Sequence, residues 1–331
     1  MYGRGVSAQM AFVIFVGGFM LVSNRLLSFF GVAVASAALL AAANAADAVV
    51  SFSDLTALMS DGGSSSRAAH RQAIAAIPLQ RMPTAQRQTA ERCLKSTTLY
   101  RHLPCETFVC DTALLEFSLR KPEAIVDIWR TLGISQLSLD PTGAGQWRLS
   151  DGFGTVGTLR LLHCEQRGSS GVLVFHGRGG YSGPLTPKDL TGTCLLLVRY
   201  GAAQPAAESG DRQTVQIDAF LDVDGIGLEI VTRTLKPLIV HSAAANFHEI
   251  CLFMQTFSAA AVDNPAGVVQ LTTRLSRTNP IDRCALSSIA RSAADDGAVL
   301  GPADPAAAAH LQTELASRWL PVSEFNNLHQ R

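Results

Sequence analysis

Between residues 214 and 225 the chain alternates between apolar and polar side chains. One face holds the apolar side chains of Val215, Ile217, Ala219, Leu221 and Val223. The other face holds Gln216, Asp218, Asp222 and Asp224, with Phe220 as the exception. A period of two is typical of a β-strand. We therefore expect a strand with one dry face toward the core and one wet face toward solvent.

Four further apolar runs precede this strand, at 134–140, 157–163, 171–177 and 193–201. Short turns rich in Gly, Ser and Pro separate the runs, and none of these turns is long enough to hold a crossover helix. The pattern predicts an antiparallel meander and excludes a doubly wound parallel sheet.

Helical spacing of apolar residues appears on both sides of the strands. The segment 121–133 has Pro122 in its first turn and ends at Gly133, as amphipathic helices often do. After the strands, apolar residues recur every three or four positions: Leu228, Val231, Leu235, Ile239, Ala243, Phe247, Ile250, Met254 and Phe257. These predict one helix over 227–261, about 50 Å long. Pro237 should kink or divide it.

The predicted fold class is α+β, with an antiparallel meander sheet packed on a long C-terminal helix and extra short helices beyond it. We expect an α+β core domain at 99–261 and a helical C-terminal extension at 262–331, which contains an Ala/Pro-rich linker at 292–309. Residues 46–98 are expected to be a flexible or partly helical tether, with a helix around 68–76.

The N-terminus is typical of an export signal. Asn24-Arg25 precedes an apolar stretch that ends in Ala43-Asn44-Ala45, so we predict a signal peptide at 1–45. A second apolar run at 10–22 suggests that translation starts at Met10 or Met20. A membrane hairpin is the rival interpretation, although 10–22 is shorter than the roughly 20 residues that a span needs. We expect an exported protein of the periplasm, cell envelope or extracellular space.

Net charge and cysteine spacing exclude further classes of function. The formal net charge is +0, which argues against a nucleic-acid partner, because such a partner requires a basic surface. The seven cysteines form no Cys-x-x-Cys pair, so metal ribbons and thioredoxin-like chemistry are not expected. Seven is an odd number, so at least one cysteine is unpaired or pairs outside the chain.

His248-Glu249 resembles the start of a zinc-protease helix, but Leu252 stands where the second histidine is required. His241 and Cys251 could join His248 in a metal site, yet packing explains the segment better. We expect His248 at the edge of the apolar stripe with a hydrogen-bond partner, and we predict no metal.

Two other segments resemble catalytic or calcium motifs without completing them. VLVFHGRGGYSG, at 172–183, is similar to a hydrolase oxyanion loop, but no Gly-x-Ser-x-Gly follows; a hairpin with positive-φ glycines is expected instead. An EF-hand around Asp222 and Asp224 would need acidic residues at Phe220 and Val231. Asp224 is better explained as a helix cap. We predict no catalytic residue and no cofactor.

Three segments, KPEAIVDIWRTLGISQLSL, DGFGTVGTL and LTGTCLLLVRYG, together resemble an uncharacterised family of exported bacterial proteins. Leu103-Pro104-Cys105-Glu106 matches the family's Leu-Pro-x-Glu opening, and Leu235–Leu238 matches its Leu-x-Pro-Leu helix. The resemblance spans 99–261 and implies no activity. The order of elements is also similar to START/Bet v 1-like helix-grip folds, in which a curved sheet and the last helix enclose an apolar cavity.

These observations predict a non-catalytic protein that binds an apolar small molecule or lipid between the sheet and the long helix. The candidate ligand-binding residues are His176, Tyr200, Leu221, Leu235, Ile239 and Phe247. One alternative is a structural or interaction protein with a solid core and an envelope protein partner. The other is an enzyme of unknown class, whose first groups to inspect would be His176, Asp222, Asp224, His241 and His248.

Overall fold

The computed structural model describes residues 63–182, 190–203, 212–223, 236–293 and 305–320. The predicted signal peptide, Asp224 and Leu235 lie outside this part of the chain. The side chains of Ile239 and His241 also lie outside it.

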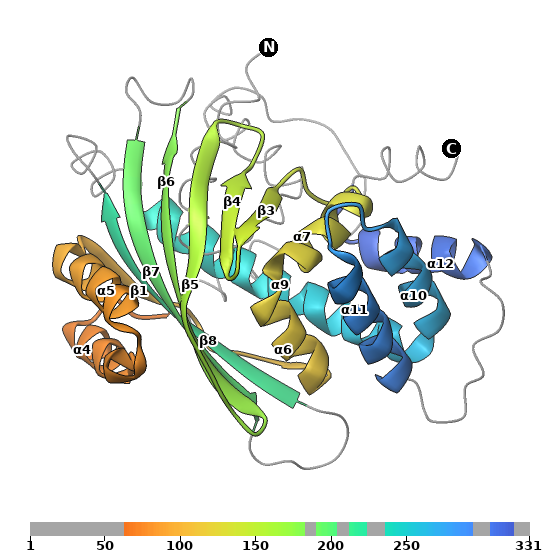
Figure 1. Ribbon diagram of the computed structural model, residues 1–331, viewed down its shortest axis with the longest axis horizontal. Helices are drawn as coiled ribbons and strands as arrows, with labels where there is room; N and C mark the ends of the chain where they lie inside the picture. Colours follow the sequence, from red (N-terminus) through yellow and green to blue (C-terminus); the bar gives the residue numbers. More distant parts are fainter. Residues whose placement is uncertain (1–62, 183–189, 204–211, 224–235, 294–304, 321–331) are drawn as a thin grey trace, which may run out of the picture.

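The centre of the molecule is an eight-stranded open sheet in which every pairing between the described strands is antiparallel (Figure 1). Its strands are β1 Leu99–His102, β2 Glu106–Val109, β3 Ser138–Gly143, β4 Gln146–Ser150, β5 Thr155–Arg167, β6 Ser170–Tyr181, β7 Leu190–Ala202 and β8 Arg212–Val223. The order is β1-β8-β7-β6-β5-β4-β3, and β2 also pairs with β8. The antiparallel meander and the α+β class are therefore confirmed. Strands β1, β2 and β4 were not predicted from the sequence.

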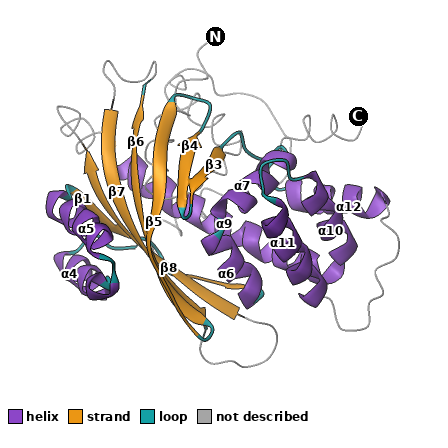
Figure 2. Cartoon of the chain, in the orientation of Figure 1, coloured by secondary structure: helices purple, strands orange, loops and turns teal. Residues whose placement is uncertain are grey.

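Helices cover one face of the sheet and continue beyond it (Figure 2). They are α6 Thr112–Arg120, α7 Pro122–Thr131, α9 Lys236–Asp263, α10 Pro265–Arg274, α11 Pro280–Ala293 and α12 Pro305–Ala316. Helix α9 contains the second part of the helix predicted over 227–261. Residues 227–235 lie outside the described chain, so the full length and the kink at Pro237 stay predictions. Helices α10 to α12 follow α9, and their apolar residues join the same core as the sheet.

The helix expected around 68–76 is present as α4 Arg67–Ala76, but the segment before the sheet packs against the strands instead of forming a flexible tether. Residues 63–98 include α4, the 3-10 helix η1 Leu79–Arg81 and α5 Thr84–Ser96, which lie on the opposite face of the sheet (Figure 1). Ala73, Ile77, Met82, Ala90 and Cys93 are buried there. Few apolar residues are scattered among many polar ones in this segment, but helical spacing gathers them on the side that meets the sheet.

This second helical layer also corrects the expectation of a wet face on β8. Phe220 is fully buried in a second hydrophobic core with Tyr100 and Leu195, so it is not an exception to the pattern. Asp218 is 0% exposed. Both faces of the central strands are therefore covered within the described structure.

Buried hydrogen bonds compensate Asp218 for its loss of water. The Tyr100 hydroxyl donates to Oδ1 over 2.7 Å, and His102 Nδ1 lies 2.7 Å from the same oxygen. Arg199 Nη2 donates to Oδ2 over 2.8 Å. A buried carboxylate with three polar partners is consistent with the rule that buried charges are paired.

Among the described residues, no helix is both long enough and apolar enough to span a membrane.

Candidate functional site

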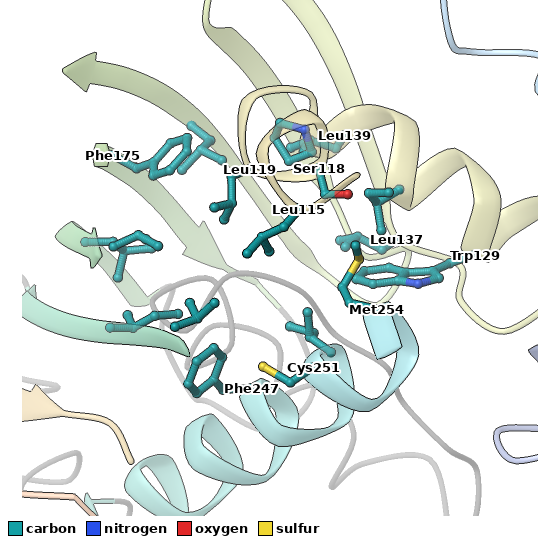
Figure 3. Close-up of a pocket in the computed structure, with 18 of the residues that line it drawn as sticks. Leu115, Ser118, Leu119, Trp129, Leu137, Leu139, Phe175, Phe247, Cys251 and Met254 are labelled. Carbon is teal, nitrogen blue, oxygen red and sulfur yellow. The ribbon is translucent and has the colours of Figure 1, made fainter. Parts of the chain in front are cut away.

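An apolar cavity of about 120 Å³ lies between the sheet, α6, α7 and α9 (Figure 3). The helices contribute Leu115, Ser118, Leu119, Pro122, Ile125, Trp129, Phe247, Ile250, Cys251 and Met254. The strands and the segment before β3 contribute Phe108, Leu137, Leu139, Leu149, Leu159, Phe175, Leu196, Val198, Val215 and Ile217. The cavity thus lies between the surfaces where the sequence predicted a ligand.

Local periodicity directs these side chains into the cavity. Leu196 and Val198 are two residues apart on β7, and Val215 and Ile217 are two residues apart on β8, so each pair points to the same face. On α9 the lining residues recur at helical spacing from Phe247 to Met254. Pro122 is in the first turn of α7, where its lack of an N–H is tolerated.

The lining offers almost no polar chemistry. Ser118 is the hydroxyl residue among the lining side chains, and its Oγ donates to the Leu114 carbonyl over 2.7 Å. Cys251 is the titratable residue among them, and burial raises its pKa well above the usual value. Its sulfur is therefore a neutral thiol near neutral pH, and a neutral thiol is a poor nucleophile. The arrangement can exclude water from an apolar ligand, and the described lining has no acid–base pair.

His248 lies beside the cavity wall and joins α9 to β2. Its Nδ1 is 3.1 Å and 3.2 Å from the two carboxylate oxygens of Glu106. The hydrogen bond with Glu106 raises the pKa of His248. The hydrogen-bond partner expected for His248 is therefore confirmed. The neighbouring Glu249 instead accepts hydrogen bonds from Arg318 and from Trp319 Nε1. The described residues contain no group of three His, Cys, Asp or Glu side chains suited to a metal.

The candidate ligand-binding residues are only partly brought together. Phe247 lines the cavity. Leu221 and Tyr200 belong to the same core but do not line the cavity, and the Tyr200 hydroxyl donates to Glu116 over 3.3 Å. Leu235 and the side chain of Ile239 lie outside the described structure.

His176 lies on the wrong face of the sheet to meet the cavity. It pairs with Leu195, which belongs to the second core beneath α4 and α5, whereas the neighbouring Phe175 lines the cavity. The segment after His176 does belong to a hairpin, since β6 pairs antiparallel with β7, but the positive φ expected for its glycines is not found at the described positions. Gly177, Gly179 and Gly180 continue β6 in register with both neighbouring strands, and none of them has a positive φ.

Among the cavity-lining residues, only Phe247 was one of the candidate ligand-binding residues, and α6 and β4, which carry Leu115, Leu119 and Leu149, were not predicted from the sequence. Helix α6 carries Leu115 and Leu119, and Asp111 caps it by accepting a hydrogen bond from the Leu114 N–H over 2.7 Å. The sequence does contain this signal, since Asp111 stands just before an apolar run. Strand β4 is too short for its alternation to stand out.

No protein-family model matches the chain, and no curated protein is detectably similar to it. The resemblance to a family of exported bacterial proteins therefore stays a prediction.

Proposed function

We propose that this chain is an exported, non-catalytic protein that binds an apolar small molecule, or the acyl chain of a lipid, between the sheet and α9. The observation that carries the proposal is the apolar cavity of about 120 Å³. The absence of charged side chains from its described lining supports binding rather than catalysis.

The cavity volume supports a small ligand or a part of a larger one. An engineered apolar cavity of about 150 Å³ is large enough to bind benzene and remains free of water. The cavity of 120 Å³ is similar in size, so it would hold one small ring or a short stretch of acyl chain. A whole drug-sized molecule occupies a pocket of roughly 300–1,000 Å³.

The proposal also keeps the likeness to START/Bet v 1-like helix-grip folds. An antiparallel sheet facing α9 across an apolar cavity supports that likeness. The chain differs from the helix-grip pattern in two ways. Helices α4 and α5 cover the second face of the sheet, and α10 to α12 follow α9. Export rests on the sequence pattern at 1–45 alone.

Exposed cysteines favour a second candidate function, an interaction protein of the cell envelope. Cys105, Cys164 and Cys284 are exposed and form no disulfide. In an oxidising compartment, one of these cysteines could form a disulfide bond with a partner protein. A dimer or larger species on a non-reducing gel that disappears after Cys→Ser substitution would support this function. A monomer on that gel would contradict it.

Native mass spectrometry tests the binding proposal directly. Protein purified from its own host should carry an apolar molecule that solvent extraction releases, and the stripped protein should take up toluene or decanoic acid. Val198→Phe places a larger side chain against the cavity and should abolish uptake. A stripped protein that binds neither probe, and whose melting temperature neither probe raises, would contradict the proposal.

A further inference from the structure

Three arginines surround His176 on the face of the sheet opposite the cavity. Arg160 on β5 pairs directly with His176 on β6, and Arg178 lies two residues farther along β6. Residues that are paired, or two apart on one strand, share a face. Arg92 projects from α5, the helix that packs on this side of the sheet. We call Arg92, Arg160, Arg178 and His176 the basic face.

The basic face is exposed and its charge is not neutralised by the described residues. All three arginines are exposed, and no described carboxylate forms an ion pair with any of them. Arg92 Nε donates a hydrogen bond to the Gln88 carbonyl of the same helix. The nearest acid in the ladder is Asp222, separated from Arg178 by Thr193 of β7.

Three other arginines on this side of the sheet are bound or approached by carboxylates. Arg81 and Arg167 both bind Glu165, and Arg87 lies near Glu91. Arg148 on β4 is exposed and forms no ion pair with a described residue, because Asp140 opposite it binds Arg277. The three arginines of the basic face thus differ from Arg81, Arg87 and Arg167 in having no ion pair with a described carboxylate.

His176 reports the resulting positive potential. Burial lowers its pKa, and Arg160, Arg92 and Arg178 lower it further. The ring is therefore neutral near neutral pH, and the arginines repel one another around it without compensation. An external anionic surface would relieve this repulsion.

Exposed apolar side chains lie next to the basic face. Val156 of β5 is two residues from Thr158, the residue that pairs with Arg178, so it shares the face of Arg178; it is 60% exposed. Phe153, in the turn between β4 and β5, is 43% exposed. The other large apolar side chains that are exposed in the described structure, Val109, Val262 and Ile281, lie on β2, α9 and α11. Basic side chains beside exposed apolar ones are typical of surfaces that lie in a membrane interface.

We propose that the basic face docks the protein on a lipid bilayer that carries anionic headgroups, with Arg92, Arg160 and Arg178 against the headgroups and Val156 and Phe153 in the interface. Diagonal neighbours in a sheet are about 7–8 Å apart. This spread over two strands and a helix suits a plane of headgroups better than a single phosphate. The inference goes beyond the proposed function, because the cavity lies on the opposite face and neither site requires the other.

Vesicle sedimentation of the intact chain tests this docking. The protein should sediment with vesicles that contain phosphatidylglycerol and stay in solution with vesicles of phosphatidylcholine alone. Each arginine near an anionic surface contributes about a fivefold gain in affinity. Arg160→Gln should therefore weaken binding about fivefold, and adding Arg178→Gln should weaken it about 25-fold in total. High salt should also release the protein.

Matched variants separate docking from a general charge effect. Arg291→Gln removes an exposed arginine of α11 that also has no ion pair with a described residue, and it should leave binding unchanged. Val156→Ser should weaken binding, whereas Val109→Ser, at an exposed strand position on β2, should not. Circular dichroism checks that each variant is folded.

Three results would overturn the proposal. They are no binding to anionic vesicles, an equal loss for Arg160→Gln and Arg291→Gln, and full competition by soluble glycerol phosphate, which would indicate a small-anion site. Toluene uptake measured without vesicles reports on the cavity alone, so a failure of docking and a failure of ligand binding can be told apart.

Discussion

A substitution that fills the cavity distinguishes a ligand site from a solid core. Val198 on β7 is 5% exposed and lines the cavity, so Val198→Phe adds apolar volume into the empty space. Val174 on β6 is the matched control, because it is 0% exposed in the second core on the opposite face. The two valines lie on neighbouring central strands, where Val174 pairs with Leu197 and Val198 pairs with Leu173.

The expected magnitude follows from the cavity volume. At about 24 cal/mol per Å³, an empty cavity of 120 Å³ costs about 3 kcal/mol of stability. Val198→Phe recovers part of this, so we expect the free energy of unfolding to rise by about 0.5–1 kcal/mol. Val174→Phe overpacks a filled core and should lower the free energy of unfolding by about 1–3 kcal/mol.

Urea denaturation of both variants and the wild type measures this difference. We expect the two midpoints to move in opposite directions with the same dependence on urea concentration. Toluene should raise the midpoint of the wild type and of Val174→Phe, but not that of Val198→Phe. If Val198→Phe is destabilised as much as Val174→Phe, the space between the sheet and α9 is already filled and the reasoning is refuted.

Three further predictions concern contacts on the two faces of the sheet. Glu106 raises the pKa of His248, so their contact should stabilise the fold below the unfolded pKa of histidine, and this contribution should be lost as the pH rises through the folded pKa. In an NMR titration, the pKa of His248 should be lower in Glu106→Gln than in the wild type. An unchanged pKa would contradict the contact between His248 and Glu106. Asp218→Asn should lower the free energy of unfolding by about 3 kcal/mol. Asp140→Asn, in an exposed ion pair, should change it by less than about 1 kcal/mol. Equal urea midpoints for the two variants would contradict the buried role of Asp218. Met82→Ala should lower the free energy of unfolding, measured by urea denaturation, by about 2–5 kcal/mol if the N-terminal helices pack as described. A change near zero would instead indicate that this segment is a tether that does not pack on the sheet.

Local periodicity in the sequence determines the type of most elements. Alternation over 214–225 predicts β8, and the apolar spacing with Pro122 predicts α7. The short polar turns predict antiparallel pairing, because a parallel connection needs a longer crossover. These features depend on neighbouring residues, so they can be read from the chain alone. The short strands β1, β2 and β4 contain too few alternations to be recognised in this way.

The environment of each face depends on contacts between distant segments. Asp218 appears solvated in the sequence, but α4 and α5 bury the face that carries it, and Tyr100, His102 and Arg199 supply its partners. His176 appears to be a polar anchor for a ligand, yet strand alternation points it away from the cavity, into the basic face.

The sequence by itself determined an α+β chain with an antiparallel meander, and it indicated that an apolar sheet face would meet an apolar helix. Only the tertiary structure decided that these surfaces leave a cavity of about 120 Å³ between them. The physical reason is that a cavity is a small mismatch between packed surfaces. Its volume depends on how Leu115, Trp129 and Met254, from three helices, fit against the strands, and no local pattern records that fit.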